Sequence, residues 1–191
     1  MLIAVLAVAC TPVTGIGARG GSAQEPVHRL DVVSMLHLHP AADARLVADT
    51  STFADILARR LRRSGIDSRA LDVSDLVRRH DLPVEVTVRD NGASRYVDGR
   101  LPEKALLSSI EGKARHRLVL FPARLVVDRH TRATLGTVDW RLEPSEGGSP
   151  LAYGVLRYTV DARGFPGHRL AGELVAELDR LGVHGAEAGV N

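Results

Sequence analysis

The sequence contains few aromatic residues: one tryptophan, three tyrosines and three phenylalanines among 191 residues. So few rings argue against the stacking platform of a single-strand nucleic-acid binder and against an aromatic groove for sugars. The 25 lysine and arginine residues nearly balance the 23 aspartates and glutamates, which leaves a net charge of +2. A chain with so little net charge has no overall field to attract nucleic acid, and we expect none as a partner.

The motifs of the common enzyme classes are also missing. The sequence has no phosphate-binding P-loop, no G-x-G-x-x-G, no paired C-x-x-C and no G-x-S-x-G. Its carboxylates are scattered, and spacing places no pair of them for acid–base work. We therefore predict a protein that is not an enzyme.

The single cysteine, Cys10, directly follows an apolar run from Leu2 to Ala9. This run is too short to span a bilayer, which takes about 20 residues, but it has the length of a signal-peptide core. The junction resembles the lipobox of bacterial lipoproteins, in which a peptidase cuts before a cysteine that carries lipid. The resemblance implies lipidation of Cys10, and Thr11 after it implies the outer membrane, facing the periplasm. The other interpretation is a buried N-terminal strand with an incidental thiol.

These features divide the chain into four parts. Residues 1–9 are expected to be a signal peptide, and residues 10–26, with four glycines, a lipidated cysteine and flexible tether. Residues 27–184 are long enough for one domain with its own core. Since Cys10 is assigned to lipid, no disulfide is available to that domain. Residues 185–191 are expected to be a disordered tail.

The hydrophobic periodicity predicts alternating strands and helices within this domain. Strands are expected at 30–38, 67–71, 84–88, 94–97, 117–127, 137–142 and 151–160, with a bulge or break at Pro122. Helices are expected at 53–64, after N-cap hydroxyls at 50–52, and at 74–79, 102–112 and 170–181. The fold class is therefore α+β: one mixed, largely antiparallel sheet covered by helices, with a C-terminal three-strand meander followed by a helix.

This layout resembles small envelope lipoproteins of Gram-negative bacteria. Two families share it, the auxiliary lipoprotein of ABC-type lipid-transport systems and the α/β domain of penicillin-binding-protein activators and the curli-secretion lipoprotein. The matching parts are Cys10, residues 53–65, residues 118–142 and residues 170–182. The resemblance implies a non-catalytic accessory subunit that docks onto other envelope proteins in transport, assembly or secretion.

Two histidines, His37 and His39, form the sharpest candidate for chemistry. Alternation along a strand would place both imidazoles on one face, and neutral imidazole is a good zinc ligand. A third ligand would have to come from elsewhere, and the possibilities in the sequence are Asp43, Asp49, His80 and His130. One alternative function is therefore a metal-binding protein or metal-dependent periplasmic enzyme. The simpler interpretation places both histidines on a polar face, with no cofactor.

Candidate partner-binding residues are Arg59, Arg62 and Arg63 on one predicted helix and Trp140 on a predicted strand. Guanidinium groups form paired contacts with phosphate or carboxylate, although such a run is also typical of a solvated helix face. Trp140 shares a strand face with other apolar residues, which is equally typical of a core residue. A third possible function is a periplasmic lipid carrier, with sheet and helices around an apolar cavity.

Overall fold

A mixed eight-stranded sheet and two helices make up the regular structure of the described residues, namely 16–19, 27–34, 52–71, 85–100, 110, 114–131, 133–160, 164–183 and 185 of a computed structural model. The strands are β1 (Ile16–Arg19), β2 (Arg29–Ser34), β3 (Asp67–Leu71), β4 (Glu85–Asp90), β5 (Ser94–Arg100), β6 (His116–Asp128), β7 (Thr134–Pro144) and β8 (Ala152–Val160). The helices are α2 (Phe53–Arg63) and α5 (Gly167–Arg180).

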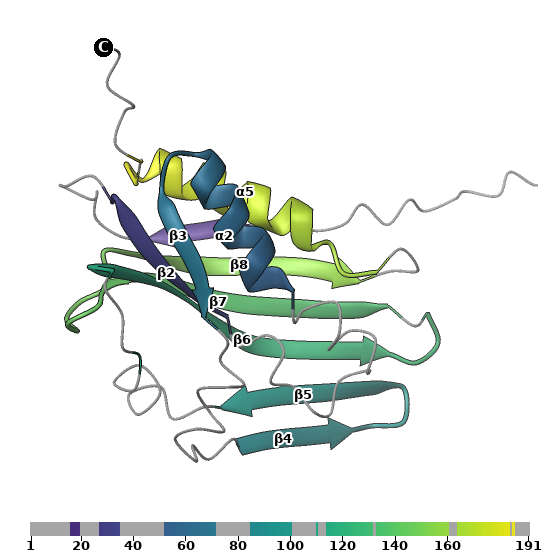
Figure 1. Cartoon of the computed structure of the whole chain (residues 1–191). Coiled ribbons are helices and arrows are strands. Elements are labelled where there is room, and N and C mark those ends of the chain that lie inside the picture. The colour runs from purple at the N-terminus through teal and green to yellow at the C-terminus, as the bar shows by residue number, and fades with distance from the viewer. Residues whose placement is uncertain are drawn as a thin grey trace, which may run out of the picture.

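The strands are ordered β1-β8-β7-β6-β2-β3, with the β4–β5 hairpin attached to β6. Strand β2 runs parallel to both β3 and β6, and all other pairs are antiparallel. Figure 1 shows α2 and α5 together on one side of this sheet. The predicted fold class is confirmed, including the meander β6–β7–β8 and the helix after it.

The core lies between the sheet and the two helices. Because side chains alternate along a strand, every second residue of β7 faces the helices, and Val138, Trp140 and Leu142 are buried there. Helix α2 contributes Phe53, Leu57 and Leu61 at helical spacing, and α5 contributes Leu170, Leu174 and Leu178. The amphipathic patterns of the sequence therefore identified the faces that meet.

The bulge expected at Pro122 is present in β6. The register between β6 and β7 shifts between Pro122 and Arg124, because proline has no N–H to continue the ladder. The same strand changes partner here: it pairs with β2 through Leu120 and with β5 from Leu125 onward. One long strand thus holds two parts of the sheet together.

A row of alternating charges crosses four neighbouring strands on the sheet face away from the helices. In register order its members are Glu143, Arg117, Asp31 and Arg69. The Arg69 guanidinium donates to both Asp31 oxygens, at 2.6 and 3.2 Å, and this hydrogen bonding raises the pKa of Arg69. Arg117 Nε lies 3.6 Å from Glu143 Oε1. Since Asp31 and Arg117 are buried, a one-residue slip of β2 would leave charges without partners, so the row fixes its register.

Several sequence predictions need correction. Residues 16–19 were placed in a flexible tether, but they form β1, because β8 supplies a hydrogen-bonding edge for them. Thr52 precedes α2 without a side-chain cap hydrogen bond, since its backbone is already helical. Gly185, the first residue of the tail that was expected to be disordered, packs against the domain. An added Cβ there would come 2.2 Å from the Gly65 carbonyl oxygen.

Other predictions fall wholly or partly outside the described residues. They are the end of the first strand at 35–38, the helix at 74–79, and the helix at 102–112 except for Ile110, which lies in irregular backbone. Within the described ranges, the hairpin around Gly92 (φ +84°) is confirmed, as are the ends of α2 and α5 at Gly65 and Gly182, both with positive φ.

Gly136 of β7 faces Tyr158 of β8 across the ladder, and the tyrosine ring covers the glycine. A Cβ on Gly136 would come 2.0 Å from the ring carbon Cζ. The ring has little freedom to move, because Tyr158 is buried and packs edge-on against Phe165, with 5.2 Å between centroids. Burial also raises the pKa of the Tyr158 hydroxyl.

We predict that Gly136→Ala lowers the free energy of unfolding by about 1–3 kcal/mol, the usual cost of overpacking a core. Urea titration followed by circular dichroism measures it. The matched control is Gly172→Ala in α5, where an added Cβ meets only the mobile end of Arg60, at 3.4 Å. That change should be neutral or stabilise by up to about 1 kcal/mol, since alanine is the better helix former. Equal destabilisation by both variants would contradict the packing argument.

Candidate functional site

Helices α2 and α5 run side by side in the same direction. Three close approaches establish this: Ile56 lies near Gly167, Arg60 near Gly172, and Gly65 near Gly185. The carboxyl-terminal ends of both helices therefore lie together, where their partial negative charges add. Two negative helix ends repel each other. Arginines occupy both last turns, namely Arg60, Arg62 and Arg63 on α2 and Arg180 on α5, and their positive charges offset the repulsion between the helix ends.

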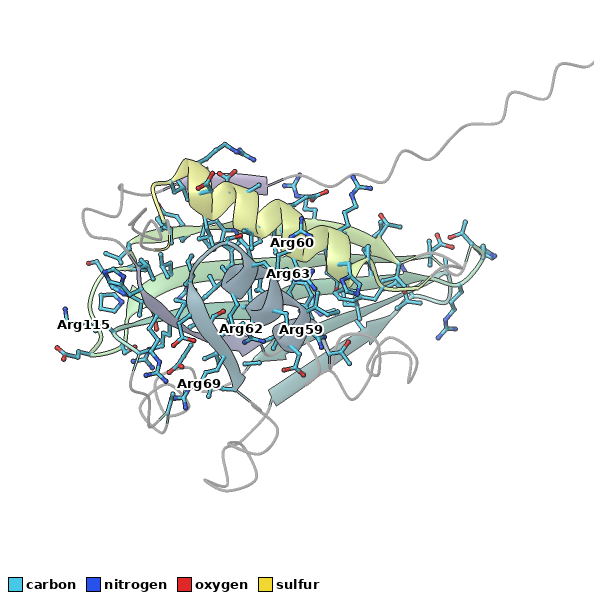
Figure 2. The ribbon with its side chains drawn as sticks, turned by 45° about the horizontal axis from the view of Figure 1, so that its top comes forward. Arg59, Arg60, Arg62, Arg63, Arg69 and Arg115 are labelled. Carbon is cyan, nitrogen blue, oxygen red and sulfur yellow. The ribbon has the colours of Figure 1, made fainter. Side chains whose placement is uncertain are left out.

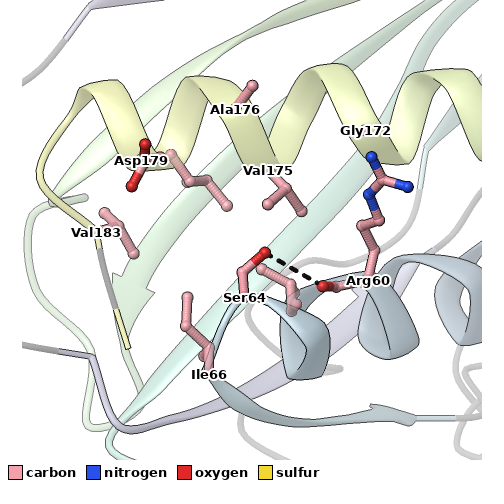
Figure 3. Close-up of a pocket in the computed structure, with 10 residues that line it drawn as sticks. Arg60, Ser64, Ile66, Gly172, Val175, Ala176, Asp179 and Val183 are labelled. Carbon is pink, nitrogen blue, oxygen red and sulfur yellow. Dashed lines mark hydrogen bonds between the residues drawn. The ribbon is translucent and has the colours of Figure 1, made fainter. Parts of the chain in front are cut away.

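A groove of about 300 Å³ opens between these two helix ends (Figure 3). Its lining residues come from α2, α5 and the turn after each helix: Arg60, Leu61, Ser64, Ile66, Gly172, Val175, Ala176, Leu178, Asp179 and Val183. The deepest of them, Leu61, Ile66, Leu178 and Val183, belong to the buried core. The groove therefore has an apolar floor and a rim of polar and charged groups, a combination typical of binding sites.

Opposite charges mark the two ends of the groove. Figure 3 shows Arg60 beside Gly172 at one end and Asp179 at the other. Gly172 has no side chain, so the Arg60 guanidinium can lie directly over α5: its Nη2 would be 3.4 Å from an added Cβ. Ser64 lies between the two charges, and its hydroxyl donates to the Arg60 carbonyl at 3.4 Å. This arrangement can hold an apolar group next to one negative and one positive charge.

The predicted arginine cluster does not form a single surface. Arg60 lies next to α5, whereas Arg62 lies beside β3 (Figure 2). There the Arg62 guanidinium donates to the Ser68 carbonyl of β3. Arg59 and Arg63 are exposed on α2. Arg62 therefore has a structural role, and Arg60 is the arginine that lines the groove.

Trp140 is fully buried, the largest such side chain among the described residues. The prediction that it contacts a partner is therefore wrong for the folded domain, and the core interpretation is correct. Its indole Nε1 has no hydrogen-bond partner among the described residues. A buried tryptophan with an unsatisfied N–H contributes through its apolar area.

The remaining candidate residues lie outside the described ranges. They are Cys10, His37, His39, Asp43, Asp49 and His80. His130 is described; it is exposed in the turn after β6, where its backbone N–H donates to the Asp128 carboxylate at 2.9 Å. Among the described residues, no three His, Cys, Asp or Glu side chains come together to hold a metal ion. The zinc site at His37 and His39 remains a prediction.

Sequence comparisons give no family for this chain. No protein-family model matches it, and no curated protein matches it. No helix in the described ranges has both the length and the apolar character to cross a membrane.

Among the solved structures to which the chain is similar are two of the PelC dodecamer from Paraburkholderia phytofirmans. One, a point variant, is 15% identical with a TM-score of 0.49, and the other is 16% identical with the same score. Each match covers 90% of this chain and 99% of the PelC chain. A likeness at this level says nothing about activity or partners.

We predict that Arg62→Ala lowers the free energy of unfolding by about 0.5–1.5 kcal/mol, since it removes a hydrogen bond to an edge strand. Arg59→Ala, one turn earlier on the same helix, should change it by less than about 0.5 kcal/mol, as surface substitutions usually do. Thermal and urea unfolding of both variants measure the difference. Equal stability of the two would show that the Arg62 contact contributes nothing.

Proposed function

We propose that this chain is a lipid-anchored, non-catalytic accessory protein of a bacterial envelope, which binds another envelope protein through the groove between α2 and α5. The acylated residue would be Cys10, and Thr11 after it favours the outer membrane, with the domain in the periplasm. Transport, assembly or secretion would be the process that it supports.

The groove is the observation that carries the binding role. Its floor is made of core side chains of α2 and α5 and the turns after them, so it has a fixed shape that a partner can recognise without reordering the protein. Its volume of about 300 Å³ is at the lower limit of small-molecule sites. We infer that it receives one or two side chains of a partner protein.

The rim specifies the chemistry of that partner. Arg60 favours an acidic group at one end of the groove, where Arg63 on the same helix adds to the positive charge. An apolar side chain fits the floor between Leu61 and Val175. The partner segment would therefore carry a leucine- or phenylalanine-like residue close to an aspartate or glutamate.

A photoreactive amino acid at Ala176, an exposed residue of the rim, tests this role in membranes of the source cell. It should crosslink to one discrete protein, whereas the same probe at exposed Arg157 on β8 should not. Gly172→Leu should abolish the Ala176 adduct by filling the groove, and Arg60→Glu should reduce it by reversing the charge. Gly172→Leu should keep or raise the melting temperature, since glycine is a poor helix former. An adduct that persists in the folded Gly172→Leu variant would contradict the proposed site.

The anchor has a separate test. Cells expressing the full chain should incorporate labelled palmitate into the protein, and Cys10→Ala should abolish the label and release the protein from the membrane fraction. Label that persists in Cys10→Ala, or unlabelled wild-type protein free of membranes, would argue against lipidation at this residue.

A further inference from the structure

Strand β1 fixes the point at which the N-terminal chain joins the folded domain. Ile16 pairs with Leu156 and Arg19 with Tyr153, so β1 runs antiparallel to β8. The chain before Ile16 therefore approaches from the carboxyl-terminal end of β8. Figure 1 shows that this end of the sheet also carries the β6–β7 turn and the β4–β5 turn.

The distance from Cys10 to this point is short. Ile16 is the sixth residue after Cys10, and a fully extended chain covers at most about 3.6 Å per residue, or about 22 Å in total. The end of β8 at Val160 lies four residues beyond Leu156, about 14 Å along the strand. If Cys10 is acylated as proposed, the membrane surface lies within about 22 Å of Ile16, and a chain that extends along β8 reaches only about 8 Å past the end of the strand.

The two turns at this end are hydrogen-bonded to each other and form one surface, which we name the turn end: Asn91–Ala93 and Arg129–Thr131, with Leu135. The Arg129 backbone N–H donates to the Ala93 carbonyl at 2.9 Å and connects the turns. The Asp128 carboxylate accepts the N–H groups of His130 at 2.9 Å and Thr131 at 2.8 Å. These hydrogen bonds hold the pKa of Asp128 below its usual range, and the bond from the Thr131 N–H contributes most.

The turn end presents the side chains that suit a lipid surface. Arg129 and His130 are exposed there, and the Arg129 guanidinium can bind phosphate. Among the described residues, two large apolar side chains are highly exposed. They are Leu135, the second residue of β7, which is 53% exposed, and Tyr153 at the start of β8, which is 44% exposed. Leu135 lies close to the turns, whereas Tyr153 lies near the opposite end of the sheet.

We propose that the turn end rests on the phospholipid leaflet that holds the anchor, with Leu135 in the interfacial layer and the groove directed away from the membrane. This orientation rests on the proposed lipidation of Cys10. It follows from the short connection to β1 and from the exposed apolar and basic groups at the same end.

Fluorescence quenching in vesicles tests the orientation with the full acylated chain. Because lipid blocks Cys10, the substitution His130→Cys introduces one reactive thiol at the turn end for a fluorophore, and Glu146→Cys introduces one in the β7–β8 turn at the opposite end. The protein is placed in phosphatidylethanolamine–phosphatidylglycerol vesicles that contain lipids with nitroxide headgroups. The label at residue 130 should be quenched several-fold more than the label at residue 146.

Two further variants test the contribution of the apolar contact. Leu135→Asn should reduce quenching at residue 130, whereas Tyr153→Asn, the matched exposed apolar residue, should leave it unchanged. Mass spectrometry of the N-terminal peptide separates the two proposals. Protein without acyl chains at Cys10 would overturn the proposed anchor together with the orientation. Acylated, vesicle-bound protein with equal quenching at both labels would overturn the orientation alone.

Discussion

The pairing of β6 is the constraint on which the rest of this fold depends. One edge of β6 binds β7 along nearly its whole length, while the other edge has to serve β2 and β5 in turn. Pro122 lies at the point where the partner changes, next to the shift in the β6–β7 register. Before the proline, β6 brings in β2, and with it β3 and α2. After it, β6 brings in the hairpin.

The parallel course of α2 and α5 gives the molecule two different ends. The unit β2–α2–β3 places α2 on the sheet. Helix α5 follows the meander β6–β7–β8 and packs beside α2 in the same direction. Two parallel helix dipoles repel each other, and arginines in both last turns relieve this. One of them, Arg60, also lies on the rim of the groove, so one electrostatic requirement of the fold also contributes to a recognition surface.

Much of this architecture could be predicted, because its signals are local. The meander, the hairpin at Gly92 and the two helices follow from alternation, turn residues and helical spacing within short windows. Strand β1 could not, because residues 16–19, which lie in a glycine-rich stretch, become a strand only when β8 offers an edge. The groove could not either, since it depends on how residues near 60 and near 175 pack together. The arginine run was visible in the sequence, but its division between a structural contact at Arg62 and the groove at Arg60 depends on tertiary packing.

The contact of Arg62 with β3 has a consequence for crowding. In a parallel ladder alternate residues bond to opposite sides, and the Asp67 N–H bonds to β2, so the Ser68 carbonyl points away from the sheet. Arg62 occupies that acceptor, which leaves the outer edge of the sheet less able to recruit a strand from another molecule. A charged side chain across an edge acceptor is thus protection against strand-to-strand aggregation at high density.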